Sequence, residues 1–504
     1  MAGRWLGYDR SRVHRLHRQL SVAADELATL AAAGAPAGAD ISAVVGTILG
    51  SLRSEWAPLL GRIGDDASLT SWTAPADIRR VDLPASQPPS GGADVVARWW
   101  DALSRAEQDT VIAEAPAAIA NLDGVPAWAR DSANRLLLAR DLEHLGARAV
   151  AGTLTDEEAT VLANARAVSA ALVDAAVFVD AHTGAPVPVQ LYLYEPAAFD
   201  GDGRAAVVLG DLDDARHVAV AVSGAGTEVA RLGTTVPEVV YAEASSYASD
   251  GIAVMAWVGY DAPSLSVVDG TDPDPVDDAV DWIDEAGDLA HVLTIGSATR
   301  GAAALADDIK GLREMRGHDR VHLTVIGNSY GSTTVAIAAD EFGLDADDVV
   351  LTGSPGVGRA DNAADLTTGT SHTWVGSASD DPVSQFGRTG GAEPHDLVEL
   401  AAGPDVGLGN DPAEDDFGAQ RFQAEWPGRN ADPPWSIEGH ARYFNRCAEA
   451  PTNIGAIVAG EYDAVRLAEQ RHKDESWDLW DPFGDLRASD PEAHEPVEDG
   501  SCVE

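Results

Sequence analysis

The sequence predicts a doubly wound α/β fold with a mostly parallel sheet, preceded by an all-helical N-terminal region. Apolar residues recur at helical spacing up to about residue 180 and then gather in short strand-like runs. Several of these runs are apolar at almost every position, which is typical of strands covered by helices on both faces. Because the runs alternate with helical patterns, we expect parallel strands joined by helical crossovers.

The chain has 504 residues, enough for about two or three domains. We expect a helical hairpin over residues 1–63 and a linker rich in Ser, Pro, Asp and Gly over 64–92. A helical region over 93–180 would pack on the sheet domain, which spans 181–465. An acidic C-terminal tail covers 466–504, and we expect its Trp-rich start to dock on the body.

Two capping boxes predict where helices begin in the second helical region. In each box a Ser or Thr is followed three residues later by Glu, and each side chain accepts a backbone N–H from the other residue. The pairs are Ser104 with Glu107 and Thr155 with Glu158. The second box opens a helix that we expect to run to about Ala176.

Apolar runs predict the strands of the sheet. They are rich in Val, Ile, Leu and Ala and are bounded by Gly, Asp or Ser. The predicted strands cover residues 187–194, 204–209, 217–222, 252–258, 321–326, 348–353 and 372–377. A helical pattern over 302–315 precedes the fifth of these strands.

The charge of the chain limits its partners. It carries 82 acidic and 34 basic residues, a formal net charge of −48. Such a field repels phosphate backbones, so we expect no nucleic-acid partner, and anionic membrane surfaces are disfavoured. The hydrophobic content of 45% allows a sizeable core.

No segment predicts a membrane span or a classical signal peptide. No run approaches the roughly 18 consecutive apolar residues that a span needs, and the N-terminus lacks an apolar signal core. We expect a soluble protein, either cytoplasmic or exported without a classical signal; the compartment and the oligomeric state stay open. Cys447 and Cys502 are too few for a disulfide framework, and we expect Cys447 to pack as a small apolar residue.

The segment Gly327-Asn-Ser-Tyr-Gly331 is the strongest functional signal in the chain. It has the G-x-S-x-G pattern, follows the apolar strand 321–326 and precedes a run of small residues that is compatible with a helix. This is the setting of a nucleophile elbow, in which a tight strand-to-helix turn presents a serine Oγ above a parallel sheet. We therefore expect Ser329 to be a nucleophile.

A serine nucleophile needs a carboxylate and a histidine, which in this arrangement follow it in that order along the chain. Asp381 is the first choice for the acid because Asp381-Pro-Val383 follows a late strand, at the same edge of the sheet as the elbow. Asp380 is a rival, and Asp361, after the preceding strand, is a weaker one.

His440 is the first choice for the base because it lies in a loop that enters an apolar helix. His395 satisfies the same chain order. His322 and His372 lie within predicted strands, and we expect them to be core or edge residues. The base would take the proton of Ser329 and later return it to the leaving group.

The oxyanion hole should combine the Tyr330 N–H with an N–H of the loop after the third strand, Ser223-Gly-Ala-Gly-Thr227. Ala225 is the first candidate donor and Gly226 the second. The loop also begins a G-x-G pattern, but Val229 stands where the third glycine of a dinucleotide site would fall. The acidic loop 269–288 lacks the spacing of a calcium loop, so we expect no cofactor or metal.

Several short motifs occur together over about residues 95–460. They include Trp257-Val-Gly-Tyr-Asp-Ala-Pro263, Leu351-Thr-Gly-Ser-Pro-Gly356 and His440-Ala-Arg-Tyr-Phe444, besides the elbow. In this combination the chain resembles an actinobacterial α/β-hydrolase family of unknown function. The family usually has His at the position of Asn328. The resemblance implies an α/β-hydrolase fold and a triad of Ser329, Asp381 and His440.

The sequence favours a serine hydrolase that cleaves carboxylic esters, from small molecules or lipids, through an acyl-enzyme on Ser329. One alternative is a non-catalytic or effector-type interaction protein that binds a partner through its helical region. Another is an amidase or peptidase that uses the same triad, because the triad alone does not set the bond that is cleaved.

Overall fold

A computed structural model describes residues 88–89, 91–248, 251–263, 295–316, 320–384, 408–427, 437–471 and 490–494. The chain divides into two compact units, residues 1–81 and 82–504, and every described residue belongs to the second. The predicted hairpin over 1–63, the acidic loop 269–288 and His395 lie outside the described residues.

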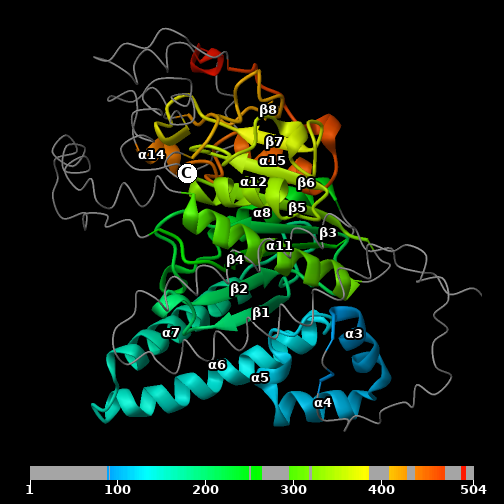
Figure 1. Cartoon of the computed structure of the whole chain (residues 1–504), viewed down its shortest axis with the longest axis vertical. Helices are drawn as coiled ribbons and strands as arrows, with labels where there is room; N and C mark the ends of the chain where they lie inside the picture. Colours follow the sequence, from blue (N-terminus) through cyan, green and yellow to red (C-terminus); the bar gives the residue numbers. More distant parts are fainter. Residues whose placement is uncertain are drawn as a thin grey trace, which may run out of the picture. The chain divides into compact units, whose positions relative to one another are not determined.

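An eight-stranded sheet forms the centre of the second unit, in the order β1-β2-β4-β3-β5-β6-β7-β8 (Figure 1). The strands are β1 (Val189–Glu195), β2 (Arg204–Leu209), β3 (His217–Val222), β4 (Ile252–Val258), β5 (His322–Asn328), β6 (Asp348–Thr352), β7 (Thr373–Gly376) and β8 (Gln420–Phe422). β2 runs antiparallel to both of its neighbours, and all other pairs are parallel. The predicted α/β-hydrolase sheet is confirmed, with β8 as a strand that the sequence did not predict.

Helices cover both faces of the parallel strands. They are α11 (Gly296–Arg316) and α12 (Tyr330–Glu341) on one face, and α8 (Thr235–Tyr247) and α15 (Ala450–Val458) on the other. Neighbouring residues of β3 divide between the two layers: Val220 packs with the first pair of helices and Ala219 with the second. This is the two-sided burial that the continuous apolar runs predicted.

Five helices precede the sheet among the residues that the structure describes. They are α3 (Ala93–Ala102), α4 (Arg105–Glu114), α5 (Pro116–Ile119), α6 (Ala127–Val150) and α7 (Asp156–Ala176). Both predicted capping boxes are present, at the starts of α4 and α7. Short turns complete the described elements: η2 (Phe199–Gly201), η3 (Val229–Arg231), η4 (Ala363–Asp365), α14 (Ile437–His440), η6 (Tyr462–Ala464) and η7 (Pro491–His494).

Helix α7 is, within the described ranges, the one helix long and apolar enough to cross a membrane by length and composition. Its buried residues Val168 and Leu172 pack in one cluster with Leu191 of β1 and Val207 of β2. Its first turn carries three acidic residues. A helix that covers a sheet passes the same length and composition test, so α7 is weak evidence for a membrane span.

Two described segments of the predicted tail 466–504, residues 466–471 and 490–494, pack on the sheet domain. Arg471 is fully buried, and its Nε donates to Asp490 Oδ2 at 2.5 Å. Arg421 of β8 donates to the same carboxylate at 2.9 Å. The boundary predicted at residue 465 therefore does not separate these pieces from the sheet domain.

Cys447 is disulfide-bonded. The prediction that it packs as a free apolar side chain is wrong. Its position after α14 gave no sign of the bond, because one cysteine pair in a long chain carries no spacing pattern.

A buried carboxylate links β5, β6 and β7 at the ends of the strands opposite the elbow. Asp348, fully buried at the start of β6, accepts from His322 Nε2 at 2.7 Å and from Tyr462 Oη at 2.7 Å. Its other oxygen accepts from His372 Nδ1 at 2.8 Å and Trp374 Nε1 at 2.9 Å. His322 begins β5 and His372 precedes β7, so both lie at the ends of the strands opposite the elbow.

His322 lies between two acceptors, because its Nδ1 is 2.9 Å from the Val458 carbonyl and its Nε2 faces Asp348. Only the imidazolium can donate from both nitrogens. Burial works against that charge, but the bonds to Asp348 and Val458 raise the pKa of His322 above its usual value. When it is protonated, the ring therefore joins β5 to β6 and to the end of α15.

We expect this contact to make stability depend on pH. Because the folded-state pKa of His322 is raised, its contribution is fully present below about pH 6.5, the unfolded value, and is lost as the pH rises through the folded value. Urea unfolding of the wild type and of His322→Gln should show the largest difference on the acid side of this window. The matched control is His182→Gln at an exposed histidine. A difference for His322→Gln that stays constant through neutral and alkaline pH would contradict the charged ring.

Candidate active site

Ser329 lies at the turn between β5 and α12. Its φ of 56° and ψ of −134° lie outside the favoured regions for a residue with a side chain, and such strain is typical of a nucleophile elbow. The glycines of the motif are needed for space. A Cβ on Gly327 would lie 2.5 Å from Ser332 Cα, and one on Gly331 would lie 2.5 Å from the Val222 carbonyl oxygen.

Neighbouring strands hold Ser329 from both sides. Its N–H donates to the Thr352 carbonyl at the end of β6, at 2.9 Å. On the other side, a Cβ built on Gly224 would lie 2.9 Å from Ser329 Cβ and 3.4 Å from its Oγ. The loop after β3 therefore lies directly against the serine side chain, which is half-buried.

Asp381 and His440 form a hydrogen-bonded pair. His440 Nδ1 is 3.0 Å from Asp381 Oδ2 and 3.1 Å from Oδ1. Tyr443 Oη donates to Oδ2 at 2.7 Å, and the Val383 N–H donates to Oδ1 at 2.8 Å. Burial alone would raise the pKa of Asp381, but the charge of His440 and these hydrogen bonds hold it below its usual value.

Gly353 connects this pair to the elbow. It follows Thr352, which accepts the Ser329 N–H, and it has a left-handed φ of 53°. A Cβ at this position would lie 3.0 Å from both Asp381 Oδ2 and His440 Cε1. The acid–base pair therefore lies beside Gly353, one residue after the strand end that holds the Ser329 N–H.

The rival residues lie elsewhere. Asp380 accepts from Trp426 Nε1 at 2.7 Å and lies under Gly439 of α14. Asp361 is exposed, and its own N–H donates to Asp365. His322 and His372 bind Asp348 at the amino ends of the strands, opposite the elbow.

The predicted oxyanion donors differ in their availability. The Gly226 N–H donates to the Pro263 carbonyl at 2.8 Å, so it is already engaged in this structure. The Ala225 N–H has no partner among the residues that the structure describes. Tyr330 is the first residue of α12. Of the two candidate donors in the loop after β3, Ala225 is therefore the better one.

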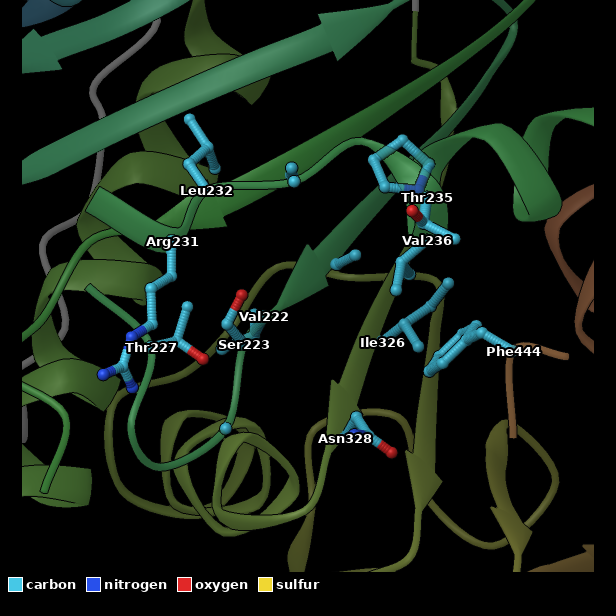
Figure 2. Close-up of a pocket in the computed structure, with 15 residues that line it drawn as sticks. Val222, Ser223, Thr227, Arg231, Leu232, Thr235, Val236, Ile326, Asn328 and Phe444 are labelled. Carbon is cyan, nitrogen blue, oxygen red and sulfur yellow. The ribbon is translucent and has the colours of Figure 1, made fainter. Parts of the chain in front are cut away.

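A cavity of about 260 Å³ opens beside the elbow (Figure 2). Its lining includes Ser223 and Gly224 from the loop after β3 and Asn328, the residue before the nucleophile. Thr235 from the start of α8 and Phe444 also line it. Within the described part of the chain no cluster of three or more His, Cys, Asp or Glu side chains is arranged to hold a metal.

Three residues of the site were not singled out from the sequence. Tyr443 binds Asp381 and also accepts the Ala378 N–H at 3.0 Å, so it fixes the acid loop to the segment that carries the base. Gly224 and Gly353 leave room for the serine and for the acid–base pair. Tyr443 follows His440 by three residues, and this spacing was the available signal.

Comparison with known proteins fits this geometry. Residues 200–390 match an alpha/beta hydrolase family. The uncharacterized protein Rv2079 of Mycobacterium tuberculosis is 35% identical over 436 residues, which cover 81% of this chain and 62% of that protein. The uncharacterized protein Mb0988c of Mycobacterium bovis is 31% identical over 252 residues, 45% of this chain and 84% of that protein.

The chain belongs to the α/β-hydrolase family. The resemblance to a family with actinobacterial members of unknown function is thereby confirmed. The chain spans 62% of the length of the Mycobacterium tuberculosis relative, less than two thirds.

Solved structures with a similar fold include esterases. An esterase from Pyrobaculum calidifontis is 16% identical and covers 61% of this chain and 94% of its own, with a TM-score of 0.27. An esterase from Pseudomonas putida is 15% identical and covers 66% and 98%, with the same TM-score of 0.27. At these TM-scores the likeness adds nothing to what the sheet order already gives.

Proposed function

We propose that this α/β-hydrolase family member is a serine hydrolase that cleaves carboxylic esters through an acyl-enzyme on Ser329. The observation that supports the proposal is the Asp381–His440 pair, which lies against Gly353, the residue after the one that accepts the N–H of the strained Ser329. A serine followed along the chain by a carboxylate and then a histidine supplies the parts of a nucleophilic hydrolase.

In the first half-reaction, Ser329 Oγ attacks the ester carbonyl carbon while its proton passes to His440 Nε2. Asp381 holds the other ring nitrogen and stabilises the imidazolium. The carbonyl oxygen becomes an oxyanion that the Ala225 and Tyr330 N–H groups would bind. The C–O bond of the leaving alcohol then breaks, and the alcohol takes the proton from His440.

In the second half-reaction, water replaces the alcohol. His440 takes a proton from the water as its oxygen attacks the acyl carbon, and it returns the proton to Ser329 Oγ as the acyl–serine bond breaks. The products are a carboxylic acid and the free enzyme. The same steps would cleave an amide, whose amine is the poorer leaving group.

A fluorophosphonate probe tests the proposal. We expect the probe to label the folded wild type on one residue, Ser329, because an activated serine attacks phosphorus as it attacks a carbonyl carbon. Ser329→Ala should not be labelled. Ser245→Ala is the matched control, because Ser245 lies on α8 and its Oγ donates to the Ala242 carbonyl within that helix. A folded wild type that is neither labelled nor active on any ester would contradict the proposal and favour a non-catalytic interaction protein.

A further inference from the structure

We propose that the cavity beside Ser329 binds the acyl part of the substrate and selects short acyl groups that carry a neutral oxygen near the ester carbonyl. The inference rests on the proposed ester cleavage at Ser329. It adds the chemical class of the acyl group and a residue, Asn328, that would recognise it.

The position of the cavity assigns it to the acyl side. β4 and β3 lie on one side of β5 in the sheet, and β6, β7 and β8 lie on the other. Asp381 follows β7 and His440 follows β8, whereas the loop after β3 lines the cavity. The leaving alcohol must lie beside His440 to receive its proton. Phe444, four residues after His440, lines the cavity as well, so sheet order alone does not assign it. The ester carbonyl oxygen would bind at the loop after β3, which also lines the cavity, and on that ground we assign the cavity to the acyl chain.

The size of the cavity limits that chain. Its volume is about 260 Å³, whereas an apolar cavity of about 150 Å³ holds benzene, so on the order of ten non-hydrogen atoms fit. Its floor consists of buried apolar side chains, among them Ala221, Ala256, Ile326 and Leu232. An acyl chain of up to about eight carbons fits on this estimate, and a palmitoyl chain does not.

Asn328 is one of the polar residues of the lining, with Ser223, Thr227, Arg231 and Thr235. Its Oδ1 accepts from Thr352 Oγ1 at 3.0 Å, which fixes the orientation of the amide. The Nδ2 donors have no partner among the described residues, and the side chain lines the cavity (Figure 2). An N–H donor in this position is satisfied by an acceptor on the ligand, and so favours an acyl group with a hydroxyl, oxo or ether oxygen.

Arg231 also lines the cavity, but its guanidinium group already has partners in the protein. Its Nη1 donates to the Gly226 carbonyl at 3.1 Å, and its Nε lies 3.5 Å from Glu228. The side chain is also exposed to water. With a net charge of −48 on the chain, a negatively charged acyl group would be repelled during approach. The oxygen that Asn328 recognises should therefore be neutral.

A series of p-nitrophenyl esters with one leaving group tests both features. For the wild type we expect kcat/KM for the 3-methoxybutanoate, whose ether oxygen can only accept, to exceed that for the butanoate by about five- to tenfold, the worth of one neutral hydrogen bond. The palmitate should fall at least about tenfold below the octanoate, because its chain does not fit. Asn328→Asp keeps the acceptor for Thr352 but removes the donor, so the ratio of methoxybutanoate to butanoate should fall to about one.

The control is Asn362→Asp, the same replacement at the N-cap of η4, where the new carboxylate can still accept the Ala364 N–H. It should leave the ratio unchanged. A palmitate turned over as fast as the octanoate overturns the size limit, and an unchanged ratio in Asn328→Asp overturns the role of Asn328. In both cases hydrolysis that depends on Ser329 would persist, so the proposed function would still stand. Absence of all ester hydrolysis and of probe labelling would instead overturn the proposed function, and the acyl pocket would fall with it.

Discussion

Asp381→Asn is expected to lower kcat for a p-nitrophenyl butanoate by about 10³- to 10⁴-fold with little change in KM. All three hydrogen-bond partners of the Asp381 carboxylate are donors: His440 Nδ1, Tyr443 Oη and the Val383 N–H. An asparagine has a single oxygen, so its NH₂ group must replace one of the two acceptors. If the NH₂ group faces His440, the ring proton moves to Nε2, and that nitrogen can no longer take the proton of Ser329.

Asp380→Asn is the matched control for this experiment. The two carboxylates are adjacent in sequence and both are buried, but Asp380 binds the Trp426 indole instead of a histidine. Its replacement should change kcat by less than about threefold, because no proton acceptor is reoriented. Both variants should be compared with the wild type by circular dichroism. A larger loss of kcat for Asp380→Asn than for Asp381→Asn would transfer the acid role to Asp380.

The parts of the fold that the sequence predicted are those with a local signal. β3 and β4 are continuous apolar runs because they are buried on both faces, and the predicted bounds of both match the structure. The capping boxes of α4 and α7 are likewise local, since each joins residues three apart. β8 has no such signal: it has three residues and includes Gln420 and Arg421.

The candidate site shows the same division. The elbow is local, and the strained φ of Ser329 follows from its G-x-S-x-G pattern. The pairing of Asp381 with His440 spans 59 residues, so chain order and the resemblance supported it, not spacing. The bond from Tyr443 to Asp381 and the contact of Gly224 with Ser329 depend on how loops from different strands meet. Chain order carries no information on such contacts.

Asp490→Ala is expected to lower the free energy of unfolding by about 3–5 kcal/mol, the usual cost of leaving a buried charge without its partner. Asp490 is fully buried and binds both Arg421 and Arg471, which are themselves buried. Without Asp490, Arg471 keeps one carboxylate partner, Asp411, at 3.3 Å. Urea unfolding measures the loss. Asp463→Ala, at an exposed aspartate of η6, removes the same charge and should cost less than about 0.5 kcal/mol.

The effect should also reach the acid loop. Arg421 Nη2 donates to the Ser377 carbonyl at 2.9 Å, and Arg471 Nη2 donates to the Ala378 carbonyl at 3.2 Å. These carbonyls begin the loop that carries Asp381, so Asp490→Ala should lower kcat as well as stability, and Asp463→Ala should lower neither. Equal stability of the two variants would show that the segment 490–494 contributes nothing to the fold.

The pH dependence of this contact has the opposite sign to that of His322. Burial would raise the pKa of Asp490, but the charges of Arg471 and Arg421 lower it to about 2 in the folded protein. A carboxyl with a lowered folded-state pKa stabilises fully above its unfolded value of about 3.9, and its contribution is lost as the pH falls through the folded value. The stability difference between wild type and Asp490→Ala should therefore be constant from neutral pH down to about 4 and shrink toward pH 2. A difference that is unchanged at pH 2 would mean that the two arginines do not depend on the charge of Asp490.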